Sequence, residues 1–193
     1  SIPNSIVIGI SNTLRSRDMI LPRSSKETVT HINFLNFIEK EVFPLIDKTY
    51  GSQKFKILYG WSLGSQFSAS IFSNRVDLFD GYILSGFLQN KYLFEKYFSI
   101  SPNNLKTQKY LYASLEGVDM IPAYPEALKY FSKYQALYSD LSKLPKLKVK
   151  IENEQRLNHD QVFMASLKKG MRFIFSDFFD NTELKNNSSL AND

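Results

Sequence analysis

The sequence predicts an α/β fold, an open and mostly parallel β-sheet with helices on both faces in a three-layer α/β/α arrangement. Short apolar runs typical of buried strands alternate along the chain with longer segments whose apolar residues recur at helical spacing. Such alternation is typical of parallel sheets, because a helix returns the chain to the starting edge of the sheet. A length of 193 residues and a hydrophobic content of 43% suffice for one domain with its own core.

The first part of the chain predicts two strands separated by a helix. Ser5–Ile10 is a β-branched run that predicts a buried strand, and a long polar loop over Ser11–Lys26 follows it. Thr30–Tyr50 predicts a helix, which Pro44 should kink or divide. Phe55–Tyr59 is again a short apolar run suited to a buried parallel strand.

The rest of the chain continues the alternation. Strands are predicted over Asp80–Ser85, Gln108–Ser114 and Leu144–Ile151. Helices are predicted over Ser65–Asn74, Pro122–Leu141 and Val162–Phe175. Lysines alternate with aliphatic residues in Leu144–Ile151, which favours a strand at the sheet edge over a polybasic binding site. We therefore expect one domain over residues 1–180 and a polar tail over residues 181–193.

Residues 60–64, GWSLG, form a GxSxG motif between a predicted strand and a predicted helix, which is the context this motif requires. A serine on such a turn projects its hydroxyl beyond the strand, and glycines two residues away relieve backbone crowding. The start of the next helix directs N–H groups to the same point, so the Leu63 N–H would be an oxyanion donor. The motif predicts Ser62 as a nucleophile. The alternative is a glycine-rich turn without chemistry.

A serine hydroxyl needs a base to take its proton, and the chain contains two histidines. His159 follows the last predicted strand, whereas His31 lies near a helix start and is interpreted as a surface or capping residue. Loops that follow parallel strands meet at one sheet edge, so His159 is the predicted base. Asp119 is the predicted acid that orients it, with Glu116 as a close alternative.

Other residues of the predicted loops also point to the site. Trp61 and Phe87 are predicted to line an apolar substrate pocket, although Trp61 would also suit packing behind the turn. The charged residues within Arg15–Asp18 indicate either a working loop or a structural arginine–aspartate pair, with equal support. Asp160 is expected to cap the last helix.

The composition argues against several other functions. The chain has no cysteine, so disulfides and thiolate catalysis are excluded, and two separate histidines without clustered carboxylates predict no metal site. We expect no cofactor, since no glycine-rich phosphate loop is present. The formal charge of +5 is spread along the chain, which does not favour nucleic-acid binding, and no apolar stretch is long enough for a membrane span. The sequence does not predict the oligomeric state or the compartment.

Several stretches resemble the esterase family of α/β-hydrolases that includes esterase D and the enterochelin-type esterases. They are SIVIGISNTLRSRDM, FLNFIEKEVFPLIDKTY, ILYGWSLGSQFSASIF, DLFDGYILSGF and LNHDQVFMASLKKGMRFIF, within residues 3–175. The resemblance implies an α/β-hydrolase-like fold and hydrolysis of small-molecule carboxylic esters or thioesters through an acyl-enzyme on Ser62, with His159 as base. A peptidase or acyltransferase would use the same site.

Two departures from the family pattern shape these expectations. The acid motif is poorly matched at LEGVDM, so a Ser–His pair alone, or a non-catalytic hydrolase-like binding or regulatory domain, is the alternative. Family members also carry further strands before SIVIGI, and their third strand lies between that strand and the one before the nucleophile. We therefore expect these residues to be an N-terminally truncated piece of a longer esterase, with low activity in isolation.

Overall fold

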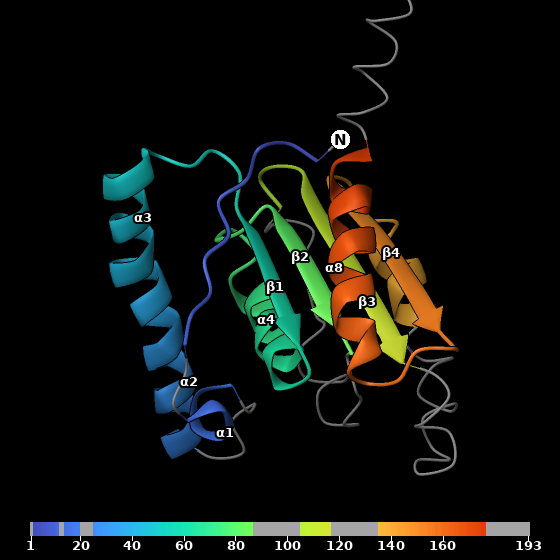
Figure 1. Ribbon diagram of the computed structural model, residues 1–193, viewed down its shortest axis with the longest axis horizontal. Coiled ribbons are helices and arrows are strands. Elements are labelled where there is room, and N and C mark those ends of the chain that lie inside the picture. The colour runs from blue at the N-terminus through green and yellow to red at the C-terminus, as the bar shows by residue number, and fades with distance from the viewer. Residues whose placement is uncertain (1, 12–13, 20–24, 87–104, 117–134, 177–193) are drawn as a thin grey trace, which may run out of the picture.

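The computed structural model describes residues 2–11, 14–19, 25–86, 105–116 and 135–176. Within these residues, four strands form one open, fully parallel sheet in the order β1-β2-β3-β4 (Figure 1). Their bounds are β1 Ile57–Trp61, β2 Gly81–Ser85, β3 Lys109–Glu116 and β4 Leu147–Glu154. The predicted α/β fold is confirmed, because strands in chain order are neighbours in one parallel sheet.

Helices cover both faces of the sheet. Helix α4 (Leu63–Asn74) packs against β1 and β2, and α8 (Gln161–Ile174) packs against β2 and β3 from the opposite side (Figure 1). Successive residues of a strand point to opposite faces, so Tyr82 and Leu84 join the core under α4, whereas Ile83 joins the core under α8. The buried strands are apolar on both faces, as their near-continuous hydrophobic runs predict.

β4 begins three residues later than the strand predicted over Leu144–Ile151. Lys146 has a φ of 64°, a left-handed conformation that an extended strand cannot contain, so the strand starts only after it. β4 lies at one edge of the sheet, and its Lys148 and Lys150 are exposed. This confirms the edge position predicted from the alternating lysines.

The helical region before β1 is longer than predicted. α1 (Arg15–Asp18) interrupts the expected loop, and α2 (Ser25–Phe37), a π-helical turn (Ile38–Val42) and α3 (Phe43–Tyr50) then form one continuous rod beside the sheet (Figure 1). The backbone N–H of Phe43 donates to the carbonyl of Ile38, five residues back. The wider π turn ends two residues before Pro44, whose ring would crowd a carbonyl four residues earlier in a regular helix.

The prediction of a buried strand over Ser5–Ile10 is wrong. This segment forms no strand in the structure, and the side chains of Ile6, Val7 and Ile8 are exposed, with Val7 90% accessible, while Ile10 packs against the core. A strand requires a backbone partner, and β1 pairs only with β2 in the part of the chain that is described. The expected central strand between this segment and β1, and the truncation, stay predictions. The predicted polar tail lies outside the described residues.

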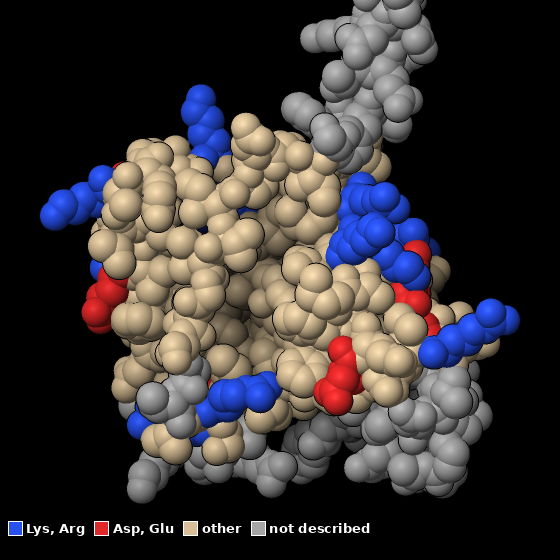
Figure 2. All heavy atoms as spheres, in the orientation of Figure 1, with Lys and Arg blue, Asp and Glu red and all other residues tan. Residues whose placement is uncertain are grey.

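The surface seen in Figure 2 is hollowed between the helical rod and the sheet, and basic and acidic side chains are scattered around its rim. Among the described residues, no helix combines the length and apolarity that crossing a bilayer requires.

Candidate active site

Ser62 occupies a sharp turn between the last residue of β1 and the first residue of α4. Its backbone has φ 57° and ψ −119°, a strained combination for a residue with a side chain. The turn is fixed from both sides, because the Ser62 N–H donates to the Ser85 carbonyl at 3.0 Å and the Ser62 carbonyl accepts from the Ser65 N–H at 2.9 Å. The turn therefore has the strand, kink and helix of the predicted nucleophile elbow.

The two glycines of the motif have different roles. A Cβ on Gly60 would lie 2.2 Å from the backbone oxygen of Gly64 and 2.4 Å from Oγ of Ser68. The contact with Gly64 is a severe clash, because backbone atoms cannot move away as the end of a flexible side chain can. A Cβ on Gly64 would meet nothing within 4 Å. The turn therefore requires glycine at position 60 only, which corrects the expectation that both glycines relieve crowding.

The environment of Ser62 suits a developing negative charge. Ser62 is the N-cap residue of α4, yet its side chain does not cap the helix and is only half-buried. The N–H groups of Leu63 and Gly64 belong to the first turn of α4, where backbone donors have no partner within the helix. Such donors, with the positive end of the helix dipole, favour an anion next to Ser62.

The structure brings His159 to the elbow, although 98 residues separate it from Trp61. The indole Nε1 of Trp61 donates to the His159 carbonyl at 2.9 Å. The two rings lie with their centroids 5.1 Å apart and their planes at 35°. Trp61 directly precedes Ser62, so the predicted base lies at the same sheet edge as the predicted nucleophile. The pairing of the Ser62 and His159 side chains remains a prediction.

The loop that carries His159 is held by a reciprocal pair of hydrogen bonds. The Gln161 N–H donates to Oδ1 of Asn158 at 2.9 Å, and the Asn158 N–H donates to Oε1 of Gln161 at 3.1 Å. This is the arrangement of a capping box, and His159 lies inside it. Asp160 makes no side-chain cap bond, so the expected cap was wrong. In the sequence, an asparagine followed three residues later by a glutamine, just before the last helix, is the signal that indicates the capping role of Asn158.

The remaining predicted site residues are only partly described. Glu116 is the last residue of β3, where its backbone pairs with Glu154, rather than part of a loop. It therefore lies at the carboxyl edge of the sheet, where β1 leads to Ser62. Asp119 and Phe87 lie outside the described residues, so their roles stay predictions.

His31 is buried rather than at the surface, with 6% of its area exposed. Its Nε2 lies 3.1 Å from Oγ of Ser70, and its ring meets Phe67 edge to face at a centroid distance of 4.9 Å. Burial lowers the pKa of the His31 imidazole, opposed by the backbone of Asp18. His31 therefore joins α2 to α4, and the surface or capping interpretation is wrong.

Helix α1 contains the structural arginine–aspartate pair that one interpretation of the charged loop predicted, and a working role for the loop stays a prediction. Arg17 and buried Asp18 form a pair with contacts of 2.6 and 3.0 Å, and the Thr30 hydroxyl donates to the Arg17 carbonyl at 3.0 Å. The arginine–aspartate pair lies within α1, and the bond from Thr30 joins α1 to α2. From the same short helix, the Arg15 guanidinium lies 5.9 Å from the Trp61 ring centroid, so α1 also reaches the elbow.

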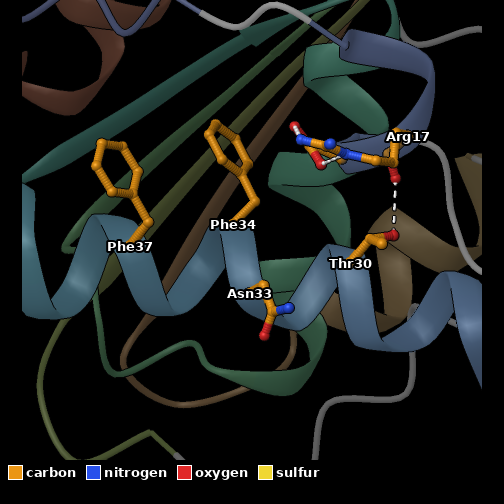
Figure 3. A pocket seen from close by; sticks show the side chains of 6 residues that line it. Arg17, Thr30, Asn33, Phe34 and Phe37 are labelled. Carbon is orange, nitrogen blue, oxygen red and sulfur yellow. Dashed lines mark hydrogen bonds and ion pairs between the residues drawn. The ribbon is translucent and has the colours of Figure 1, made fainter.

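A cavity of about 380 Å³ lies between α1 and α2. Phe34 and Phe37 project from α2 in the same direction beside it, and Arg17 and Thr30 lie near its other end (Figure 3). The rings of Phe34 and Phe37 are nearly parallel, with centroids 6.3 Å apart. The cavity therefore combines an aromatic wall with a charged end.

No group of three or more metal-ligating side chains occurs in the described ranges.

No family model and no curated protein match the sequence. Among solved structures, the BES protein from Bacillus cereus is 27% identical, with a TM-score of 0.66 over 86% of this chain and 64% of that one. An IroE-like serine hydrolase from Shewanella oneidensis is 24% identical, with a TM-score of 0.67 over 88% and 59%. The siderophore hydrolase EstA from Aspergillus nidulans is 18% identical, with a TM-score of 0.65 over 88% and 68%.

The chain spans between 59% and 68% of the length of these three proteins. Each likeness covers most of this chain. One of the three proteins is named a serine hydrolase and another a siderophore hydrolase. These likenesses confirm the α/β fold that the sequence predicted.

Proposed function

We propose that the protein is a serine hydrolase that cleaves carboxylic esters or thioesters of small molecules through an acyl-enzyme on Ser62. The observation that carries this proposal is the backbone of Ser62, with φ 57° and ψ −119° between a parallel strand and a helix. A strained non-glycine residue at such a junction needs a reason, and presenting a nucleophilic hydroxyl to an oxyanion site supplies one.

The proposed reaction has two steps, which are the formation of an acyl-enzyme on Ser62 and its hydrolysis by water. His159 takes the proton of the Ser62 hydroxyl as its oxygen attacks the substrate carbonyl carbon. The resulting oxyanion is stabilised by the Leu63 N–H, which is worth about 3 kcal/mol in comparable sites. The intermediate collapses, the alcohol or thiol leaves with the proton from His159, and the acyl group stays on Ser62. Water then attacks the acyl-enzyme with the same proton transfers and releases the acid.

The other site residues have supporting roles in this proposal. Asp119, or alternatively Glu116, orients the imidazole and stabilises its charge. Trp61 and Phe87 form an apolar side of the substrate site. Because the Aspergillus nidulans neighbour is named as a siderophore hydrolase, esters of the siderophore class are the first natural substrates to test.

A fluorophosphonate probe tests the nucleophile directly. We expect the wild-type protein to be labelled and Ser62→Ala to remain unlabelled. Ser73→Ala is the matched control, because Ser73 lies on the same helix α4 and its hydroxyl makes no hydrogen bond to any residue that the structure describes. His159→Gln should slow labelling by at least about a hundredfold, since the base is then missing.

Two results would contradict the proposal. One is equal labelling of Ser62→Ala and wild type, which would place the reactive group elsewhere. The other is the absence of any labelling in the longest natural chain that contains these residues. That second result would favour the alternative function, a hydrolase-like domain that binds its ligand without turnover.

A further inference from the structure

Side-chain hydroxyls, one of them half-buried and the others buried, hold the first turn of α8, which begins two residues after His159. The Tyr59 hydroxyl on β1 donates to the Phe163 carbonyl at 2.8 Å. The Ser166 hydroxyl donates to the Val162 carbonyl at 2.6 Å. These bonds add to the bond from Trp61 to the His159 carbonyl. Figure 1 shows this turn at the arrowhead end of the strands, where the elbow also lies.

Ser166 is the centre of a buried cluster of three hydroxyls. Ser85 on β2 lies 3.0 Å from Ser166 Oγ, and Ser114 on β3 also hydrogen-bonds to that oxygen. All three serines have 0% of their area exposed. A hydroxyl has one proton to donate and can accept two. If Ser85 and Ser114 both donate to Ser166, the proton of Ser166 is left for Val162, and every hydroxyl in the cluster is satisfied.

Together these groups tie one helical turn to three strands. We define the α8 clamp as the hydroxyls of Tyr59, Ser85, Ser114 and Ser166. A buried hydroxyl without a partner is costly, so the helix cannot slide or rotate without breaking several bonds at once. A core needed only for stability would be served as well by apolar residues of similar size.

We propose that the α8 clamp positions the His159 imidazole for proton transfer to and from Ser62. This proposal rests on the proposed function. The clamp fixes the carbonyls of Val162 and Phe163, three and four residues after His159, and the Asn158–Gln161 capping box fixes the loop on both sides of it. The members of the clamp touch neither substrate nor nucleophile, so they are positioning residues and not catalytic ones.

Ser166→Ala tests the proposal with Ser70→Ala as its matched control. Each variant removes one buried hydroxyl, but Ser70 faces His31 and Ser166 faces the turn after His159. For an activated aryl ester, we expect Ser166→Ala to lower kcat about tenfold with KM within about twofold of wild type, because misplacing a general base slows chemistry more than binding. Ser70→Ala should keep the wild-type kcat even where its stability falls equally.

The two histidines provide a readout that needs no substrate. In spectra of ¹³C-labelled imidazoles, Ser166→Ala should shift or split the His159 signal and leave His31 unchanged, and Ser70→Ala should do the reverse. Unchanged His159 signals and kcat in Ser166→Ala would overturn the proposal. If the wild-type chain hydrolyses no ester, the proposed function fails, but the spectra still decide whether the clamp positions His159.

A second variant covers the case in which Ser166→Ala does not fold. Tyr59→Phe removes the hydroxyl, with its bonds to the Phe163 carbonyl and to the Ser85 side chain, and keeps the ring against Phe163, where the centroids lie 5.5 Å apart. We expect the same displacement of the His159 signal and a decrease in kcat of about threefold. A His159 signal identical to wild type in Tyr59→Phe would then overturn the proposal.

Discussion

The indole N–H of Trp61 donates to the backbone carbonyl of His159 at 2.9 Å, so the residue before the predicted nucleophile Ser62 contacts the residue predicted as its base. This contact joins the end of β1 to the loop that follows β4, two segments 98 residues apart in the chain. Trp61 therefore packs against His159, and its place beside a substrate stays a prediction.

Trp61→Phe separates the hydrogen bond from the aromatic contact. The variant keeps a ring beside His159 but has no N–H to donate, so we expect kcat for ester hydrolysis to fall about tenfold with a small change in KM. Steady-state kinetics with an aryl ester measure the effect. Phe163→Leu is the control, since it removes the edge contact with Trp61 and leaves the hydrogen bond intact. Equal losses in both variants would mean that packing, and not the bond, matters.

Gly60→Ala should destabilise the protein much more than Gly64→Ala. The new methyl group at position 60 would clash with the backbone of Gly64, so we expect the free energy of unfolding to fall by about 3 kcal/mol. At position 64 the methyl group meets open space in the first turn of a helix, and the change should stay within about 1 kcal/mol. Urea unfolding of both variants checks this, and equal destabilisation would contradict the geometry of the turn.

His31 should make the stability of the protein depend on pH. Burial lowers the pKa of its imidazole below the ordinary value of 6.5, so the folded state binds the proton less readily than the unfolded state. This contribution is fully present above about pH 6.5 and is lost as the pH falls toward the lowered pKa. Urea titrations between pH 7.5 and 5 should reveal the slope, and His31→Gln should remove it. A His31 midpoint above 6.5 by NMR would contradict the prediction.

Glu152 should contribute to stability in a more acidic range. Its burial raises the pKa, but hydrogen bonds from Lys150, Tyr112 and Lys169 outweigh this and lower the pKa to about 2. The contribution is therefore present above the unfolded value of 4.5 and is lost as the pH falls toward 2.

Glu152→Gln tests this contribution at two pH values. It should reduce the free energy of unfolding at pH 7 by on the order of 1–2 kcal/mol, once solvent screening is allowed for, and should have little effect near pH 2. Asp140→Asn is the control, because its pair with Lys143 is exposed and should contribute almost nothing. A loss that is the same at both pH values would show that packing, and not charge, is responsible.

Local segments were predictable because their geometry follows from neighbouring residues. A short apolar strand, a GxSxG turn and a helix define the elbow within about fifteen residues, and no distant contact is needed to specify it. The parallel strand order also follows from the alternation of strands and helices. By contrast, an apolar run becomes a strand only when a partner pairs with its backbone, so the same pattern misled at Ser5–Ile10.

The sequence by itself determined the α/β fold and the position of Ser62 on its turn. Only the tertiary structure decided which histidine is buried against Ser70, which one Trp61 holds, and how Ser85, Ser114 and Ser166 meet. Serines are common and carry no periodic signal, so nothing in the order of residues distinguishes these three from others. Their hydroxyls meet because β2, β3 and α8 pack close enough together to bring them into hydrogen-bond distance. The packing of the whole core sets that separation.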